Sequence, residues 1–190
     1  MKGAETSEPL GVLRKLPRLV EYDDRWPQLF LDLRDRLYEA LQDRILSVHH
    51  VGSTAVPGLL AKPVLDVLVG IADFDAALEC VPSLADLGFE FRPHDAIPDR
   101  HFFRAERDGL RTHHLSLAET TSTHYINALV FRDALRESPE FAREYEALKM
   151  KLLQDELRTG TFPPDGKDEF VMKVVASRGG QRLPKAGLLR

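Results

Sequence analysis

The sequence predicts an α+β fold in which a small mixed β-sheet, with helices packed on it, is followed by a helical C-terminal part. Three observations support this expectation. Short apolar runs alternate with amphipathic segments in the first half of the chain. The pair Asp108-Gly109, a favoured two-residue hairpin turn, separates two extended runs at 101–107 and 110–118. Beyond residue 122, apolar residues recur at steps of three and four, which is the period of an amphipathic helix.

One domain accounts for most of the chain. A length of 190 residues suits a single globular domain, which we place at residues 18–177. Residues 1–17 are polar and contain two prolines, so we expect a flexible N-terminal arm. Residues 178–190 carry four basic residues and no acid, and we expect a flexible basic tail. With 43% hydrophobic and 29% charged residues, the composition excludes collagenous, disordered and membrane-spanning chains.

Besides the hairpin, four segments have the pattern of β-strands. Segment 64–71 is nearly all apolar and is bounded by a proline and an aspartate, which is typical of a central strand buried on both faces. Segment 45–51 is rich in β-branched and apolar residues. Shorter strands are expected at 89–92 and, at an edge of the sheet, at 18–22.

Helices are predicted from the spacing of apolar residues and from their end signals. Between the strands, helices are expected at 26–41 and 73–87, with a loop and one helical turn at 52–63. Ser138-Pro139 ends one helix and starts the next, because serine caps helix N-termini and proline fits the first turn. The helices of the second half are expected at 123–137, from 139 onward, and around 170–175.

Charge and cysteine content limit the function classes. The formal net charge is −4, and a basic footprint is missing except locally, so we do not expect a nucleic-acid partner. The single cysteine, Cys80, cannot form an internal disulfide, which fits a protein of the reducing cytoplasm. Residues 1–10 lack a basic region followed by an apolar run, so we expect neither a secretory signal nor a membrane partner.

The segment from Gly52 to Asp66 carries the strongest indication of chemistry. A P-loop is excluded, because that motif needs four residues between its glycines and a lysine directly after the second. Here five residues separate Gly52 from Gly58, and Lys62 comes four later. A strand that ends in Gly52-Ser53 predicts a different phosphate cradle, in which glycine allows close backbone approach and serine donates hydrogen bonds to phosphate oxygens.

Asp66 lies in an otherwise apolar strand, where an unpaired carboxylate is costly. The functional interpretation is that Asp66 is a Mg²⁺ ligand for nucleotide phosphates. The alternative is that Asp66 caps a backbone N–H or pairs with an arginine, and the sequence leaves both open.

The chain resembles the GrpB family, a branch of the nucleotidyltransferase superfamily. Several blocks carry the resemblance, in the family's order and between residues 19 and 176; the longest covers residues 50–59 and 62–66. The other blocks are Tyr22-Asp23 with Trp26-Pro27, Pro98-Asp99-Arg100 with Phe102-Phe103, residues 111–115, residues 131–133 and residues 145–149. The resemblance implies a nucleotidyltransferase-like mixed sheet, as in polymerase-β-type enzymes, with a Gly-Ser loop and an acidic strand.

The resemblance also implies a reaction. Active members of the superfamily hold two Mg²⁺ ions with two alternating carboxylates on one strand and a third on a later strand. Here Leu68 follows Asp66 at the position of the second carboxylate, so we expect ordinary two-metal catalysis to be feeble or absent. The leading hypothesis is transfer of a nucleotidyl group from a nucleoside triphosphate to an unknown small-molecule or protein acceptor, with Mg²⁺ or Mn²⁺ as the cofactor.

Candidate site residues follow from these blocks. Asp66 and His114 are the candidate catalytic residues. Imidazole suits Mn²⁺ or Zn²⁺, so Asp66, His114 and His50 could form a mixed metal site, although a histidine in a strand is more often a structural residue. Of the two adjacent histidines, only one of His113 and His114 can face Asp66, because side chains alternate. The residues expected to bind the nucleotide are Gly52, Ser53, Thr54, Lys62, Arg100 and Arg132.

Two other function classes stay open. A catalytically silent nucleotide- or metal-binding regulatory module would account for the missing carboxylate. An RNA-binding accessory protein is suggested by relatives in fold that act on tRNA, although the acidic net charge argues against it. Arg104 and Arg111 are either phosphate clamps, because guanidinium binds such groups in a fork, or ordinary surface ion pairs.

Overall fold

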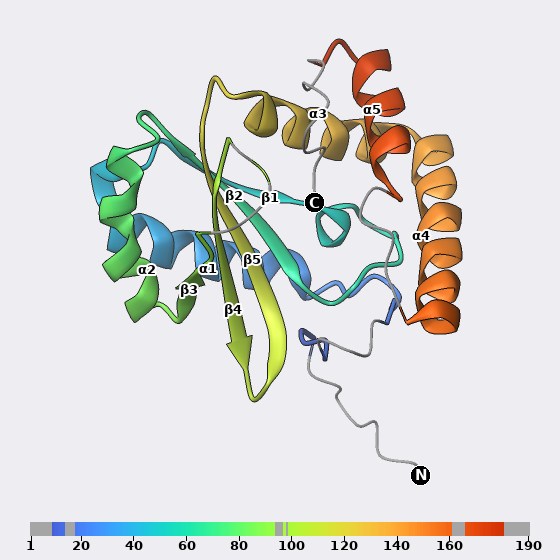
Figure 1. Cartoon of the computed structure of the whole chain (residues 1–190), viewed down its shortest axis with the longest axis horizontal. Helices are drawn as coiled ribbons and strands as arrows, with labels where there is room; N and C mark the ends of the chain where they lie inside the picture. Colours follow the sequence, from blue (N-terminus) through green and yellow to red (C-terminus); the bar gives the residue numbers. More distant parts are fainter. Residues whose placement is uncertain (1–8, 14–17, 94–96, 98, 161–165, 181–190) are drawn as a thin grey trace.

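The fold is a five-stranded mixed β-sheet with helices on both faces (Figure 1). The computed structural model describes residues 9–13, 18–93, 97, 99–160 and 166–180. The strand order is β1-β2-β5-β4-β3, in which β2 and β5 are parallel and the other neighbouring pairs are antiparallel. The bounds are Ser47–Val51 (β1), Leu65–Ile71 (β2), Phe89–Phe91 (β3), His101–Arg107 (β4) and Leu110–Glu119 (β5). The predicted class and the predicted hairpin are confirmed.

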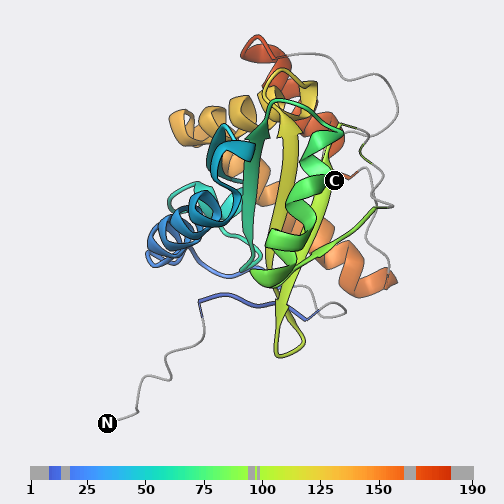
Figure 2. The ribbon, with the colours of Figure 1, turned by 90° about the vertical axis from the view of Figure 1, so that its left-hand side faces the viewer.

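Two groups of helices cover the two faces of the sheet. Helices α1 (Trp26–Leu41) and α2 (Val81–Asp86) pack on one face, and α3 (Thr123–Glu137) packs on the other (Figures 1 and 2). Helices α4 (Pro139–Thr159) and α5 (Asp168–Ser177) pack against α3. In the described part of the chain, 3₁₀ helices lie at Gln42–Arg44, Ser53–Ala55 and Ala76–Cys80.

Strand β2 is buried on both faces, as its apolar sequence predicts. Val67 points into the core under α1, where it joins Leu115 of the parallel neighbour β5. Leu68 lies on the opposite face and packs in a cluster with Tyr125 of α3. Because side chains alternate along a strand, Asp66 shares the face of Leu68 and is directed to the side of the sheet that α3 covers.

Two predicted elements differ from the structure. The expected edge strand at 18–22 is reduced to a single bridge between Val20 and Ala61. The expected helix at 73–87 is a 3₁₀ helix followed by α2. Proline has no N–H and is tolerated only in the first turn of a helix, so Pro82 starts a new helix rather than continuing the preceding one.

Part of the predicted N-terminal arm packs against the sheet. Val12 is buried and forms a bridge with Arg111 at the start of β5, and the N–H of Gly11 donates to the carbonyl of Pro63. Residues 9–13 therefore belong to the folded domain. The remainder of the predicted arm and most of the predicted tail lie outside the described residues, at 1–8, 14–17 and 181–190.

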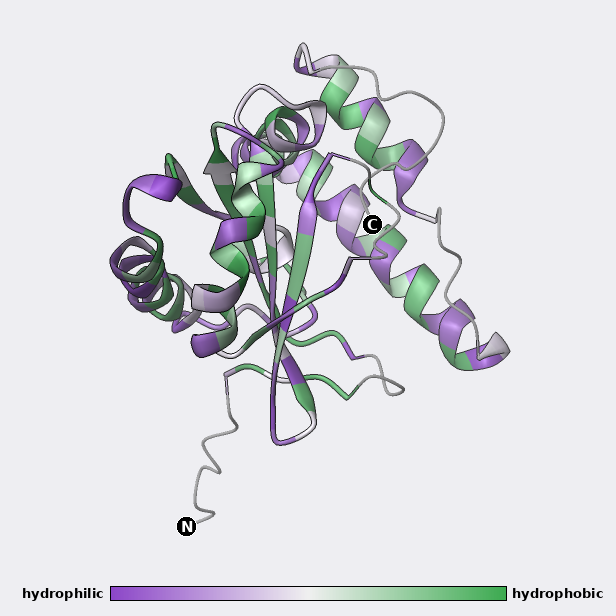
Figure 3. Ribbon diagram, turned by 60° about the vertical axis from the view of Figure 1, so that its left-hand side comes forward, coloured by the Kyte–Doolittle hydropathy of each residue, from purple (hydrophilic) through white to green (hydrophobic). Residues whose placement is uncertain are grey.

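Helix α4 has the end signals that its sequence predicts. The Ser138 hydroxyl accepts a hydrogen bond from the N–H of Phe141, and Gly160 ends the helix in the left-handed conformation. Figure 3 shows that hydrophobic and hydrophilic residues alternate along α4, which is the pattern of a helix with one packed face. None of the helices in the described ranges has both the length and the apolar character that crossing a membrane requires.

The central position of β5 gives a test of the fold. Leu115 is fully buried between β2 and β4, so Leu115→Ala should lower the free energy of unfolding by about 2–5 kcal/mol because it leaves a cavity. Leu157→Ala is the matched control, since the Leu157 side chain on α4 is 63% exposed. Urea denaturation of both variants checks this; equal destabilisation of the two would contradict the assignment of β5 to the core.

Candidate functional site

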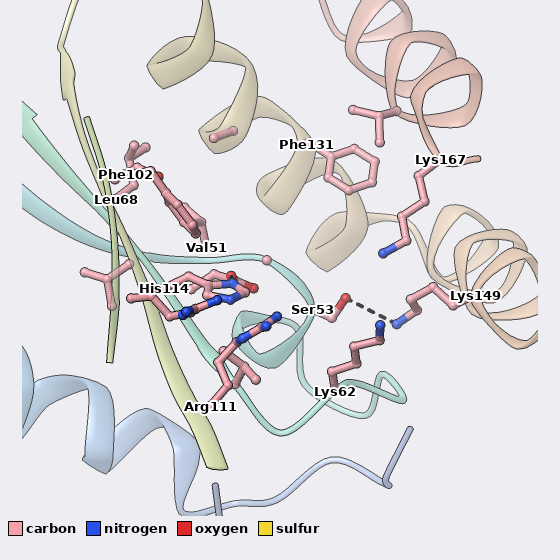
Figure 4. Close-up of a pocket in the computed structure, with 18 of the residues that line it drawn as sticks. Val51, Ser53, Lys62, Leu68, Phe102, Arg111, His114, Phe131, Lys149 and Lys167 are labelled. Atoms are coloured by element: carbon pink, nitrogen blue, oxygen red, sulfur yellow. Dashed lines mark hydrogen bonds and ion pairs between the residues drawn. The ribbon is translucent and has the colours of Figure 1, made fainter. Parts of the chain in front are cut away.

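A cavity of about 500 Å³ opens between the α3 side of the sheet, the loop that follows β1, and helices α4 and α5. Figure 4 shows its lining side chains directed into one space from these separate segments. Gly52, Ser53 and Asp66 all line it, so the Gly-Ser loop and the acidic strand share one cleft. Of the other predicted nucleotide-binding residues, Lys62 and Arg100 also line the cavity.

The Gly-Ser loop passes directly over Asp66. Gly52 has a φ of +70°, a conformation that side chains disfavour, and a Cβ built on it would lie 2.9 Å from Cβ and Cγ of Asp66 and closer still to Oδ2. A glycine is therefore required here for two reasons, the backbone conformation and the close approach to the carboxylate.

Asp66 pairs with His114. The two residues are register partners on the parallel strands β2 and β5, and His114 Nδ1 lies 2.9 Å from Asp66 Oδ1. A carboxylate can only accept, so Nδ1 is the protonated nitrogen that donates to it. The side chains of Asp66 and His114 remain 39% and 27% exposed, and the histidine ring lies 5.3 Å from the ring of Phe102. Both predicted catalytic residues are thus adjacent and face the cavity.

The predicted metal site is not assembled as expected. His50 pairs in register with Val67 and stacks on Phe30 of α1, so its ring lies on the face of the sheet opposite to Asp66. Its Nε2 is 2.9 Å from Thr54 Oγ1, and burial lowers the pKa of His50 to about 4. Asp66 and His114 therefore lack the third ligand that the sequence proposed.

A two-metal site does not fit these residues. Leu68 occupies the position of the second carboxylate and is buried against Tyr125 and Ala118. Among the residues that the structure describes, no three histidine, cysteine, aspartate or glutamate side chains are grouped so that they could hold a metal ion. Asp66 alone offers a carboxylate at this position, and a single Mg²⁺ or Mn²⁺ bound there stays a prediction.

Two of the predicted nucleotide-binding residues support the loop rather than line the cavity. Thr54 is fully buried, and its hydroxyl donates to the carbonyl of Val64 at 3.2 Å. Arg132 of α3 donates from Nη1 to the carbonyl of His50 at 3.2 Å and pairs through Nε with Asp133 at 2.7 Å. Both residues hold the end of β1 and the start of the loop in place.

Lys149 on α4 is a lining residue to which the sequence analysis assigned no role. Its side chain is almost entirely buried, and Nζ donates to Ser53 Oγ at 3.3 Å and to the carbonyl of Leu60. One turn earlier, the Glu146 carboxylate accepts from the N–H of Leu60 at 2.9 Å. Burial, followed by the nearby charge of Lys167, lowers the pKa of Lys149 to about 7. A detectable signal was present, because Lys149 follows Tyr145 by four residues on the apolar side of its helix.

The cavity is strongly cationic. Six of its described lining residues are lysine or arginine, whereas two, Asp66 and Glu156, are acidic. Figure 4 shows the ammonium groups of Lys62, Lys149 and Lys167 turned toward the same space. Burial lowers the pKa of Lys62, whose ammonium group lies 3.8 Å from the Glu156 carboxylate. The remaining lining cations are Arg100, Arg104 and Arg111. For Arg104 and Arg111 the sequence leaves open whether they bind phosphate or form surface ion pairs.

Solved structures with a similar fold define the fold class. A solved structure of terminal uridylyl transferase 4 from Trypanosoma brucei with bound dUTP superposes with a TM-score of 0.52 at 12% identity, covering 86% of this chain and 57% of that one. At this identity the similarity shows the fold alone, which is nucleotidyltransferase-like. The crystal structure of the conserved protein GrpB from Enterococcus faecalis superposes with a TM-score of 0.74 at 29% identity, covering 85% of this chain and 96% of that chain.

The chain belongs to the GrpB family, because the family described as GrpB protein matches residues 17–177. The UPF0157 protein BH1888 of Halalkalibacterium halodurans is 34% identical over 157 residues, which are 83% of this chain and 80% of that protein. The UPF0157 protein YqkA of Bacillus subtilis is 29% identical over 153 residues, or 80% of this chain. The match spans 44% of YqkA, so that relative is about twice as long as the shared region.

The close approach of Gly52 to Asp66 gives a prediction with a matched control. Gly52→Ala and Gly58→Ala both place alanine at a positive φ, which costs about 1–2 kcal/mol. A Cβ at Gly58 meets no atom within 4 Å, whereas one at Gly52 overlaps Asp66. Gly52→Ala should therefore lower the free energy of unfolding by more than Gly58→Ala, as measured by denaturant titration. If the control loses as much stability, the approach of the loop to Asp66 is looser than described.

The buried amine of Lys149 gives a pH-dependent prediction. Its pKa is about 7 in the folded state, against 10.5 as the ordinary value. Between these values the unfolded chain binds more protons at this residue, so stability contributed here rises with pH through this window. The Lys149→Met variant lacks this pH-dependent contribution. The free energy of unfolding of the variant relative to wild type should therefore be highest below pH 7 and should decline above pH 7. The expected decline is about 1.4 kcal/mol for each unit of pKa shift. Denaturant titrations at several pH values measure it; a pH-independent difference would contradict the lowered pKa.

Proposed function

We propose that the cavity binds the phosphate groups of a nucleoside triphosphate. The observation that carries this proposal is the charge of the lining, with six lysine or arginine residues in a protein whose formal net charge is −4. Phosphate groups are multiply charged acceptors, and lysine and arginine bind them with charge-assisted hydrogen bonds. A cavity in which cations outnumber acids is suited to a polyphosphate and poorly suited to a neutral or cationic ligand.

Ser53 and Lys149 are suited to hold one end of the polyphosphate. The Ser53 hydroxyl already accepts from the Lys149 ammonium, so a phosphate oxygen near both would receive donors from a hydroxyl and an ammonium group. Gly52 presents backbone without a side chain at the same place. Lys62 and Lys167 supply charge from the loop and from the residue that precedes α5.

The structural similarity to a uridylyl transferase supports a nucleoside triphosphate over other phosphate ligands, because that protein was solved with bound dUTP. The corresponding reaction would be transfer of a nucleotidyl group to a small-molecule or protein acceptor. The buried Leu68 favours a second candidate, a regulatory module that binds nucleotide without transferring it. Release of pyrophosphate in the presence of candidate acceptors distinguishes the enzyme from the module.

Calorimetric titrations with nucleotide, with and without a divalent metal, test whether Asp66 binds a metal ion. Asp66 is the carboxylate that would hold a single Mg²⁺ or Mn²⁺ against the phosphates, and Asp66→Asn should then weaken the metal-dependent part of binding by about 1–3 kcal/mol. Equal affinity of Asp66→Asn and wild type with Mg²⁺, with Mn²⁺ and with EDTA would assign Asp66 no role in metal binding.

The phosphate site predicts a selective loss of affinity. Lys62→Met should weaken binding of ATP, GTP, CTP or UTP roughly tenfold or more, because one charge-assisted contact is removed. Lys173→Met is the matched control, since Lys173 pairs with Glu144 and does not line the cavity. Isothermal titration calorimetry at two salt concentrations measures both variants. No binding of any of the four nucleotides to the wild-type protein, or an equal loss in the control, would contradict the proposed function.

A further inference from the structure

The Asp66–His114 pair engages one ring nitrogen of the histidine and leaves the other available to a ligand in the cavity. Nδ1 is held by Asp66 Oδ1 at 2.9 Å, and among the described residues Nε2 has no hydrogen-bond partner. The ring lines the cationic cavity, with the ring of Phe102 on one side. Because Asp66 fixes the proton on Nδ1, the lone pair of the neutral ring is on Nε2.

An imidazole arranged in this way is a nucleophile as well as a base. A carboxylate on Nδ1 stabilises the positive charge that develops on the ring when Nε2 forms a bond. Histidine is one of the side chains that form covalent intermediates in group transfer. The carboxylate also holds the ring orientation, so that little reorientation is needed before attack.

We propose that His114 Nε2 is the nucleophile of a nucleotidyl transfer that proceeds through a covalent nucleotidyl-histidine and without a divalent metal. This inference rests on the proposed function, because it needs a bound nucleoside triphosphate. It also gives a physical reason for Leu68, since a covalent route needs no second carboxylate for a second metal ion.

Both chemical steps balance with the groups that are present. In the first step the lone pair of Nε2 attacks the α-phosphorus, a P–N bond forms, the bond from the α-phosphorus to the bridging oxygen breaks, and pyrophosphate leaves with the electron pair. The positive charge on the ring is opposed by the Asp66 carboxylate. In the second step an acceptor hydroxyl, or water, attacks the same phosphorus, the P–N bond breaks, its electron pair returns to Nε2, and the hydroxyl proton passes to solvent.

In this route the lysine and arginine residues of the cavity stabilise the negative charge that metal ions stabilise in other phosphoryl transfers. Negative charge accumulates on the non-bridging oxygens and on the departing pyrophosphate, and preorganised cations stabilise such charge. Arg104 of β4 is the register partner of His114, so its guanidinium group starts from the neighbouring position on the same face. Arg111 lines the cavity from the beginning of β5, and Lys62 lines it from the loop.

The neighbouring histidine provides a matched control. His113 points to the other face of β5, where its Nδ1 is 2.9 Å from Thr112 Oγ1 and its ring lies 6.0 Å from that of Phe89. It does not line the cavity. Substitution of His113 should therefore leave labelling intact, whereas substitution of His114 one residue later should abolish it.

The experiment uses the full chain and each of the four ribonucleoside triphosphates with ³²P at the α-phosphate, in EDTA. The wild-type protein should acquire a label that is labile in acid and stable in alkali, as expected for a phosphoramidate, and tandem mass spectrometry should locate it on His114. His114→Asn keeps an amide donor for Asp66 but lacks the nucleophile, so labelling should fall to background. Asp66→Asn should slow labelling roughly tenfold or more. His113→Asn should label as wild type does.

Calorimetric binding of the same nucleotides separates the two proposals. Binding by the wild type with no label in EDTA, or a label that remains in His114→Asn, overturns the histidine nucleophile and leaves the proposed function intact. A label on His114 that forms only with Mg²⁺ overturns the metal-free route. Parallel reactions with ³²P at the γ-phosphate serve as a control, and a label from the γ-phosphate with none from the α-phosphate overturns nucleotidyl transfer. Absence of binding overturns both proposals. Loss of the label in His114→Asn with nucleotide affinity retained supports the inference.

Discussion

The site depends on one loop, residues 52–61, being held between the sheet and helix α4. On the sheet side, Gly52 approaches Asp66 so closely that no side chain fits between them. On the helix side, Glu146 accepts from the N–H of Leu60 while Lys149 donates to its carbonyl, so both backbone groups of one residue are held from one helix. The loop thus fixes the position of the sheet's carboxylate relative to the buried amine of α4.

Most elements that local sequence specifies agree with the prediction, whereas features that depend on distant partners do not. The turn at Asp108-Gly109 specifies the hairpin, and the apolar run at 64–71 specifies a central strand, because both signals lie within the segment itself. The metal role of His50 failed for a different reason. Which face it occupies relative to Asp66 is set by the register of β1 on β2, where Val67 is its partner, and register is a property of two segments.

The same distinction explains the candidate site. The Gly-Ser loop and Asp66 were identified because a carboxylate in an apolar strand and a glycine before a serine are unusual within their own segments. Lys149 was passed over because a lysine on an amphipathic helix is ordinarily solvated at its end. Its position among apolar residues predicts burial of the aliphatic part. The ammonium group is buried only because Leu60 and Ser53 supply acceptors from a loop that lies 89 and 96 residues away in sequence.

The distribution of charge supports the proposed small phosphate ligand over a nucleic acid. Lysine and arginine are in the minority over the whole chain, yet they predominate in the lining of the cavity, so the remaining surface has an excess of acid. We infer that such a surface would repel an extended polyanion, whereas a nucleoside triphosphate bound as proposed in the cavity of about 500 Å³ would meet cations on several sides. Under the proposed function, the acidic exterior and the basic cavity would together favour small phosphate compounds over RNA.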